Sequence, residues 1–349
     1  MIIYYDGVKL LSLSDIEGNR PEIYMVTSNR SAGKTVYFSR LLVNKFLKRN
    51  EKFMLIYRFN YELDDVGDKF FKDIGGLFFK QYEMISEKRA RGIYAELFLF
   101  DKESEGKISC GYAVALNNAD SIKKMGHLFS DTMYMFMDEF QSETNHYCNN
   151  EVDKLISIHT TVARGGGAQS RYLPIYMCSN TVTILNPYFV ALGVSDRLQK
   201  DTKFLRGVGW VLEQGYNDAA ANAQTQSTFM RAFAGQYTAY AAQAVYLNDN
   251  TAFISKPSGR GHYIATIRVD GVDYGLRQYA GEGIIYCDNS PDLTHPLRIA
   301  VTLDDHTVNY VMLKENETFI ASMKWFFNHG SFRFKNYNAK AAVLKMLSY

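Results

Sequence analysis

Short apolar runs alternate with longer amphipathic segments from about Glu22 to Val194. Continuous apolar runs are typical of strands that are buried on both faces of a parallel sheet. Such strands are predicted at residues 23–26, 53–57, 133–137 and 174–178, with a hairpin at 95–100 and 108–116. Helices are predicted at residues 36–50 and 150–163. The order of strand, helix and strand favours an α/β fold with a mostly parallel sheet.

The pattern changes near Ser195. Residues 213–245 are rich in Ala, Gln, Asn and Thr and carry aromatic residues at helical spacing: Phe229, Phe233, Tyr237 and Tyr240. We interpret this segment as a helical connector with the aromatic stripe packed in a core; a base-stacking platform is the alternative. Short strands then return at 252–255, 263–269, 275–278 and 283–287, before helices at 318–327 and 338–348. This order predicts a small second α/β domain.

We therefore expect a first domain at residues 1–198, a helical linker at 199–248 and a second domain at 249–349. The chain has 349 residues, 47% of them apolar, and a formal net charge of +2, which suits a soluble protein with two domains. Its four cysteines are scattered, so neither a disulfide framework nor a zinc site is predicted, and reducing cytosol is the expected compartment. No segment has the pattern of a membrane span or a secretion signal.

Candidate chemistry begins between the first predicted strand and the first helix. The segment Ser28-Asn29-Arg30-Ser31-Ala32-Gly33-Lys34-Thr35 matches the Walker A pattern G-x-x-x-x-G-K-[ST] except at Ser28, where the first glycine is expected. Such a loop turns backbone N–H groups and a helix N-terminus toward phosphates. We expect Lys34 to bind the β- and γ-phosphates of ATP and Thr35 to bind Mg²⁺. A Ser/Gly-rich turn without function is the alternative.

A second motif strengthens this interpretation. The apolar run 133–137 ends in Asp138 and Glu139, the pattern of a Walker B strand. Asp138 would hold Mg²⁺, and Glu139 would polarise the attacking water. Asn180, after another apolar run, is a candidate sensor of the γ-phosphate, although Asn is also common in turns. Together the motifs predict a P-loop ATPase.

Arg164 follows the predicted helix 150–163 and precedes three glycines. It is a candidate arginine finger that reaches another subunit's nucleotide, or else a solvated residue at a helix end.

The second domain offers weaker candidates. A two-metal nuclease centre would need several converging carboxylates, and solvated turn residues are the favoured alternative for these: Asp270, Asp273, Asp288, Asp292, Asp304 and Asp305. A set of basic residues could contact phosphates or be ordinary surface residues: Lys256, Arg260, Arg268, Arg333, Lys335 and Lys340. The low net charge gives no independent argument for nucleic-acid binding.

Several segments carry a resemblance to a known family: residues 28–35, 53–58, 136–140, 150–152 and 178–189. The most specific is Asn186-Pro187-Tyr188-Phe189 at its distance behind Asp138 and Glu139. In these segments the chain resembles the double-stranded DNA packaging ATPases of small tailed bacteriophages, the phi29-like encapsidation proteins. The resemblance covers the C-terminal third only in placement and size.

The resemblance implies a ring motor, usually pentameric, with an ASCE-type ATPase domain, a linker and an RNase H-like domain that usually lacks nuclease residues. It implies docking on the portal of a procapsid in the host cytoplasm, in some relatives through a structural RNA. By position, Arg164 matches a trans-acting arginine, Lys124 lies near a lysine thought to act between subunits, and Arg30 matches a basic loop residue. Two alternatives remain: a terminase-like enzyme with an active nuclease, and an adaptor that binds nucleotide without hydrolysing it.

Overall fold

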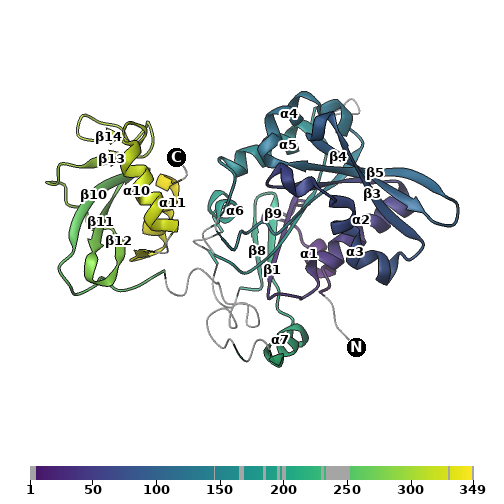
Figure 1. Ribbon diagram of the computed structural model, residues 1–349, viewed down its shortest axis with the longest axis horizontal. Helices are drawn as coiled ribbons and strands as arrows, with labels where there is room; N and C mark the ends of the chain where they lie inside the picture. The colour runs from purple at the N-terminus through teal and green to yellow at the C-terminus, as the bar shows by residue number, and fades with distance from the viewer. Residues whose placement is uncertain are drawn as a thin grey trace. The chain divides into compact units, whose positions relative to one another are not determined.

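The computed structural model describes residues 5–144, 146–164, 169–183, 186–194, 197–198, 202–228, 232, 252–328 and 331–347. The chain divides into two compact units, Met1–Leu247 and Asn248–Tyr349 (Figure 1). Among the described residues, no helix is long and apolar enough to span a bilayer.

The first unit is built on a nine-stranded sheet with the order β3-β4-β5-β2-β6-β7-β1-β9-β8. Its strands are β1 (Ile23–Ser28), β2 (Lys52–Tyr57), β3 (Tyr82–Arg89), β4 (Tyr94–Asp101), β5 (Gly106–Ala115), β6 (Thr132–Asp138), β7 (Ile175–Asn180), β8 (Phe204–Gly207) and β9 (Trp210–Gln214). The strands from β5 to β9 in this order are parallel, and antiparallel strands flank them. The predicted α/β class with a mostly parallel sheet is confirmed.

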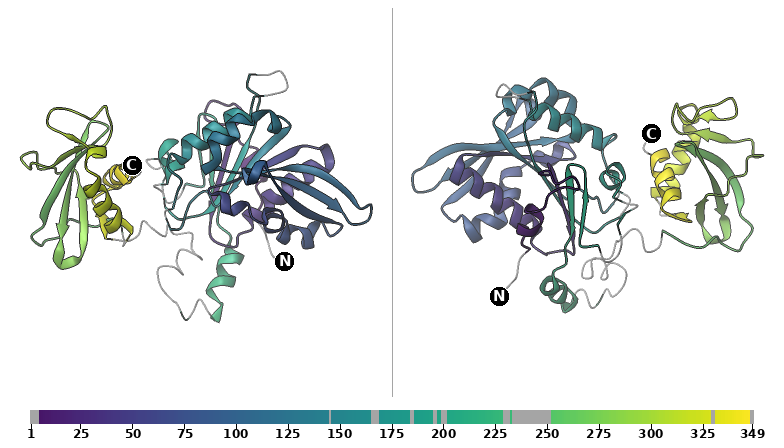
Figure 2. Two further views of the ribbon diagram at one scale, coloured as in Figure 1. Left: turned by 45° about the horizontal axis from the view of Figure 1, so that its top comes forward. Right: turned by 180° about the vertical axis from the view of Figure 1, so that it is seen from behind.

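Helices cover both faces of this sheet (Figure 2). They are α1 (Val8–Leu11), α2 (Lys34–Arg49), α3 (Val66–Phe78), α4 (Ala119–Lys124), α5 (Glu151–Val162), α6 (Pro187–Ala191) and α7 (Asp218–Thr225). Short 3-10 helices are η1 (Asn60–Leu63), η2 (Ala90–Gly92), η3 (Leu116–Asn118) and η4 (Gly126–Phe129). One core packs α1, α2 and α3 against one face, and a second core packs α4, α5 and α6 against the other. Because strand side chains alternate between faces, each apolar run supplies both cores.

The predicted helical linker is wrong at its start. Residues 204–214 form the hairpin of β8 and β9, and β9 extends the sheet beside β1. Its apolar core of Trp210, Val211 and Leu212 is short and bounded by glycine, which hides the strand in the sequence, yet all three residues are buried. The helix α7 follows within the predicted linker. The aromatic stripe Phe229, Phe233, Tyr237 and Tyr240 lies outside the described residues.

The second unit contains a six-stranded sheet with the order β14-β13-β10-β11-β12-β15. Its strands are β10 (His262–Val269), β11 (Val272–Tyr279), β12 (Ile284–Asp288), β13 (Arg298–Ala300), β14 (Val311–Met312) and β15 (Phe332–Phe334); its helices are η5 (Ala280–Glu282), η6 (Leu313–Glu315), α10 (Glu317–Asn328) and α11 (Tyr337–Leu347). Helices α10 and α11 share one core with the sheet. The strand predicted at 252–255 is wrong, because only Phe253 forms a bridge there, to Phe334.

The close pairing of β5 with β2 makes Gly111 a sensitive position. A Cβ at Gly111 would lie 2.1 Å from the Phe53 carbonyl oxygen, whereas a Cβ at Gly76, within α3, meets nothing within 4 Å. We expect Gly111→Ala to lower the free energy of unfolding by about 3 kcal/mol. The matched Gly76→Ala should raise it by about 0.5–1 kcal/mol because alanine favours the helix. Urea denaturation followed by circular dichroism measures both; equal effects would contradict this account of the sheet.

Candidate functional site

The Walker A segment forms a tight loop between β1 and α2. Gly33 has the left-handed φ of 93° and is the residue immediately before the helix, and Ser31 is also left-handed. Glycine adopts this conformation without steric cost. The loop therefore leads directly into the N-terminus of α2, where backbone N–H groups and the helix dipole favour binding of an anion.

Ser28 does not disturb the entry of this loop. It is the last residue of β1 and pairs with Asn180 in β7, so it has ordinary strand geometry and needs no glycine. Its Oγ accepts a hydrogen bond from Lys34 Nζ at 2.8 Å. The departure from the Walker A pattern thus adds a hydroxyl ligand for the lysine without forcing a strained backbone.

Lys34 is buried at the centre of the site. Besides Ser28, its Nζ donates to the Asn29 carbonyl at 3.2 Å and to Asn180 Oδ1 at 3.4 Å. Burial lowers the pKa of Lys34, and the nearby Asp138 and Glu139 oppose that shift. A cation held at the base of a phosphate loop is suited to bind phosphate oxygens.

Asp138 ends β6 beside the start of α2. Its carboxylate accepts hydrogen bonds from the Cys178 thiol at 3.2 Å and from the Glu139 N–H at 3.0 Å, and it contacts the Thr35 hydroxyl. Burial raises the pKa of Asp138. A carboxylate and a hydroxyl on adjacent elements are the oxygen ligands that Mg²⁺ accepts. These two residues therefore fit a magnesium ion.

Glu139 follows with a left-handed φ of 54°. Asn180 Nδ2 donates to its Oε1 at 3.4 Å, so Asn180 contacts both Lys34 and Glu139. The Glu139 side chain is open to solvent on one side, but the surrounding protein atoms, and then Asp138, raise its pKa to about 7. A carboxylate with this pKa can accept a proton near neutral pH.

A cavity of about 240 Å³ lies beside the acidic pair. Its walls come from α2, α3 and the ends of β2 and β6, and they include Thr35, Tyr57, Glu62, Asp138 and Glu139. The acidic pair and the residue that follows Gly33-Lys34 thus face one space. That space is large enough for several water molecules.

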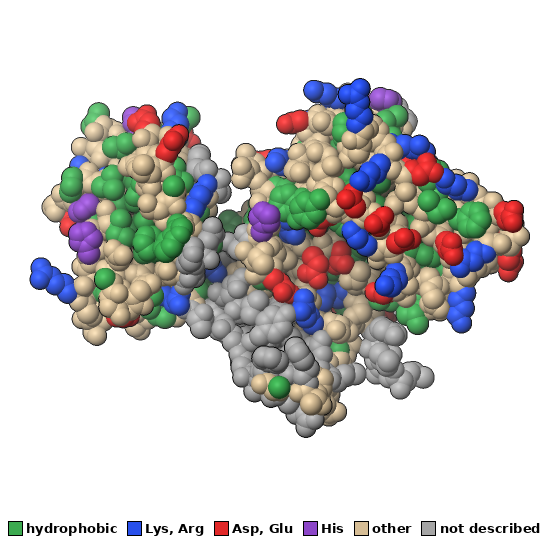
Figure 3. Space-filling model, viewed as in Figure 1, with side chains coloured by type: hydrophobic (Ala, Val, Ile, Leu, Met, Phe, Trp, Pro, Cys, Tyr) green, Lys and Arg blue, Asp and Glu red, His purple; other side chains and the backbone are tan. Residues whose placement is uncertain are grey.

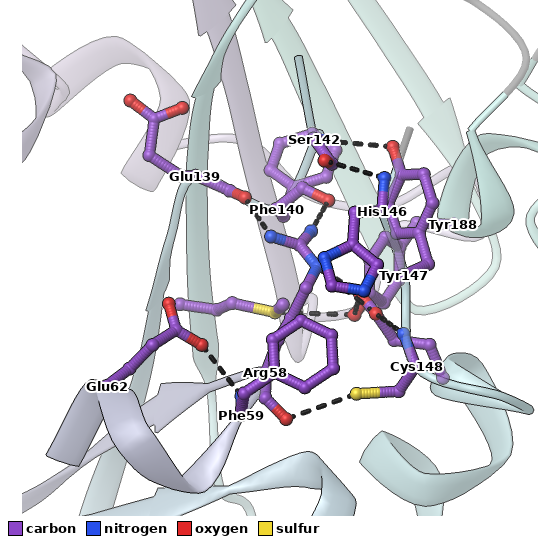
Figure 4. Close-up of polar contacts among 12 residues, drawn as sticks. Arg58, Phe59, Glu62, Glu139, Phe140, Ser142, His146, Tyr147, Cys148 and Tyr188 are labelled. Carbon is purple, nitrogen blue, oxygen red and sulfur yellow. Dashed lines mark hydrogen bonds and ion pairs between the residues drawn. The ribbon is translucent and has the colours of Figure 1, made fainter. Parts of the chain in front are cut away.

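Arg58, directly after β2, is a residue of this site to which the sequence analysis gave no role (Figure 4). Its guanidinium donates to the Glu139 carbonyl at 2.8 Å, to the Phe140 carbonyl, and to both carboxylate oxygens of Glu151 at 3.0 and 3.1 Å. Arg58 therefore fixes the backbone on which the left-handed Glu139 stands. A charged residue at the carboxyl end of a buried parallel strand was the available signal.

Glu151, the first residue of α5, completes this arrangement. It is 3% exposed and also accepts hydrogen bonds from the Tyr188 hydroxyl at 2.7 Å and the Cys148 N–H at 2.8 Å. Burial raises the pKa of Glu151, while Arg58 and these donors favour its ionised form. We regard Glu151 as ionised, because four donor contacts on two oxygens suit a carboxylate.

Of the remaining candidates, Arg30 belongs to the centre and two others lie apart from it. Arg30, in the loop, forms an ion pair with Glu143 at 3.0 Å, and its charge also acts on Lys34 and Glu139. Arg164, just beyond α5, and Lys124, at the end of α4, are exposed, and within the described part of the chain no hydrogen bond or ion pair joins either to the loop or to the acidic pair.

The six candidate aspartates of the second unit do not form a metal centre. Asp273 pairs with Arg268, Asp288 pairs with Arg277, and Asp305 accepts hydrogen bonds from the Asp270 and Gly271 N–H groups. Across the described residues, no group of three or more His, Cys, Asp or Glu side chains is placed to hold a metal ion.

Figure 3 shows basic side chains interspersed with acidic ones on the face of the first unit that it displays.

Known proteins are similar to this chain in sequence. The sequence model of the podovirus DNA encapsidation protein (Gp16) family matches residues 2–348. The DNA packaging protein of Bacillus phage phi29 is 24% identical over 339 residues, covering 96% of this chain and 94% of that protein. The DNA packaging protein of Bacillus phage B103 is 25% identical over 317 residues, covering 89% and 92%.

Two solved structures share the fold of the whole chain. A chain of the bacteriophage Phi-29 viral genome packaging motor assembly gives a TM-score of 0.55 at 22% identity, covering 98% of this chain and 99% of that one. The Phi-28 gp11 DNA packaging motor gives a TM-score of 0.58 at 14% identity, covering 99% and 98%.

The buried pair of Arg58 and Glu151 should contribute strongly to stability. We expect Arg58→Ala to lower the free energy of unfolding by about 3–5 kcal/mol, because it leaves the buried Glu151 carboxylate without its cation. The matched control is Lys88→Ala, whose pair with Asp64 is more than half exposed on both sides, and it should leave the free energy of unfolding nearly unchanged. Denaturant titration measures both; a small loss for Arg58→Ala would contradict the structural role of this pair.

Proposed function

The chain belongs to the podovirus DNA encapsidation protein (Gp16) family, and from that premise we propose that it hydrolyses ATP to drive double-stranded viral DNA into a preformed procapsid. The observation that carries the proposal is the meeting of Lys34, Asp138 and Glu139 at one edge of the sheet. The relatives are named as DNA packaging proteins of Bacillus phages, which supports the proposal that ATP hydrolysis drives DNA packaging.

Each residue has a task that its contacts suit. The loop 28–35 and Lys34 would hold the triphosphate, and Thr35 and Asp138 would hold Mg²⁺, which would neutralise phosphate charge. Glu139 orients the attacking water and accepts its proton, as its raised pKa allows. Asn180, between Lys34 and Glu139, is placed to respond to the γ-phosphate.

The exposed cations suggest how hydrolysis is coupled to assembly. Arg164 and Lys124 would complete a neighbouring copy's site in a homo-oligomeric ring. The resemblance to the phi29-like encapsidation proteins implies that this ring is a pentamer. The same proposal includes four further points that the resemblance implies. They are coupling of hydrolysis to DNA movement, docking on the portal, use of a structural RNA, and action in the host cytoplasm. Among the described residues no observation favours a nuclease, because arginines pair with Asp273 and Asp288 and backbone N–H groups bind Asp305.

The first test removes the phosphate-binding lysine. Lys34→Ala should lower kcat/KM for ATP by about 100-fold or more, because the charge that develops on the phosphates loses its buried cation. Lys48→Ala, on the same helix but exposed, is the matched control and should retain activity. Phosphate release by the full-length protein measures both. Unchanged hydrolysis by Lys34→Ala would reject this site as the source of the activity, which would then come from a contaminant, as the adaptor alternative requires.

The second test asks whether Arg164 acts between copies. Glu139→Gln retains Arg164, and Arg164→Ala retains Glu139, so mixing the two inactive variants should restore part of the ATPase activity. Neither variant should hydrolyse ATP well alone. Activity of the mixture is measured against each variant at the same total protein concentration. Normal hydrolysis by Arg164→Ala alone would reject the trans role of this residue.

A further inference from the structure

The side chain of Asn29, within the phosphate loop, forms two reciprocal hydrogen bonds with the backbone of Asn217. Its Oδ1 accepts from the Asn217 N–H at 2.9 Å, and its Nδ2 donates to the Asn217 carbonyl at 3.1 Å. Asn29 is 0% exposed. A carboxamide that pairs both polar ends with one residue's backbone imitates a rung of a β-ladder. We call these two bonds the Asn29–Asn217 clasp.

Neighbouring contacts extend the clasp along the loop. The pairing of β1 with β9 reaches Thr27 and Gln214, and the Gly215 N–H then donates to the Thr27 carbonyl at 2.7 Å. The Asn217 side chain also reaches the loop, since its Nδ2 donates to the Ala32 carbonyl at 3.4 Å. Residues 215–217 therefore follow the outer side of the phosphate loop as a continuation of the sheet.

Asn217 is also the residue from which α7 starts. Its Oδ1 accepts from the Ala220 N–H at 2.9 Å, and its carbonyl accepts from the Ala221 N–H at 3.0 Å. The carbonyl that receives Asn29 Nδ2 is thus the one that receives the first hydrogen bond of the helix. Along the chain, α7 is followed by the residues that lead to the second unit, which begins at Asn248.

The same asparagine contacts the loop's cation. Lys34 Nζ donates to the Asn29 carbonyl in this structure. A bound triphosphate competes for Lys34, because a charged phosphate is a stronger acceptor than a neutral carbonyl. Nucleotide binding therefore weakens the hydrogen bond between Lys34 and the Asn29 carbonyl, while the Asn29 side chain still binds Asn217 at the start of α7.

We propose that the Asn29–Asn217 clasp transmits nucleotide occupancy of the phosphate loop to the first turn of α7. Asn29 and Asn217 are then positioning residues that couple the loop to α7. The inference rests on the proposed function only in requiring that the loop binds ATP. It adds the route by which that binding is passed on.

Hydrogen exchange of the full-length protein tests this route. ATP with Mg²⁺ should change the exchange rate of peptides spanning 218–225 by at least about threefold, together with protection of the loop 28–35. Protection of the loop with no change in α7 would overturn the inference and leave the proposed function intact. No ATP binding at all, by calorimetry and by exchange, would reject the proposed function and the inference with it.

Variants separate the clasp from simple helix capping. Asn29→Ser shortens the side chain so that it cannot bridge to Asn217, and it should abolish the α7 response at an ATP concentration that calorimetry shows to saturate the variant. Asn217→Ala removes the cap but keeps the backbone partners of Asn29. It should speed exchange of α7 with and without ATP and retain the response.

The matched control is Asn336→Ala, which removes the equivalent cap of α11, where the Ala339 N–H donates to Asn336 Oδ1 at 3.0 Å. It should leave the α7 response unchanged. A full α7 response in Asn29→Ser would overturn the proposal. If Asn29→Ser does not fold or does not bind ATP, the test depends on the α7 response of the wild-type protein and of Asn217→Ala. Absence of the response in either protein would overturn the proposal.

Discussion

The parallel pairing of β1, β7 and β6 is the constraint on which the rest of the site depends. In this register Ser28 lies opposite Asn180, and Asp138 lies opposite Cys178. Since parallel strands end at the same edge of a sheet, residues far apart in the sequence are brought within hydrogen-bonding distance of one lysine. The loop, the acidic pair and the candidate sensor therefore form one site because of strand register rather than through any local motif.

Buried charge at this edge is balanced by contacts between elements. Lys34 is held by oxygens from the loop and from β7, and Glu151 is held by Arg58 and by two further donors. Removing a charge of this kind from water is costly unless its partners are fixed. The two groups meet at Glu139, whose backbone carbonyl is bound by Arg58 and whose carboxylate is bound by Asn180.

In the first unit, β1, β2, β6 and β7 were predictable because each is a continuous apolar run, whereas α3 and β3 were not predicted. The run 133–137 and its acidic end identified β6, and the run 174–178 identified β7. By contrast, β9 was missed, because three apolar residues beside glycine give too little pattern to distinguish a strand from a loop. Its burial comes from pairing with β1, a contact between residues nearly two hundred positions apart.

The sequence by itself determined the chemistry of the candidate site: a loop with Gly33 and Lys34, an acidic pair after a strand, and Asn180 after another. These features are local, so spacing and residue type reveal them. Only the tertiary structure decided that Ser28 binds Lys34, that Arg58 holds the backbone of Glu139 and that Asn29 holds the start of α7. Such contacts join segments that are distant in the chain, and their geometry is set by strand register and packing, which no local pattern encodes.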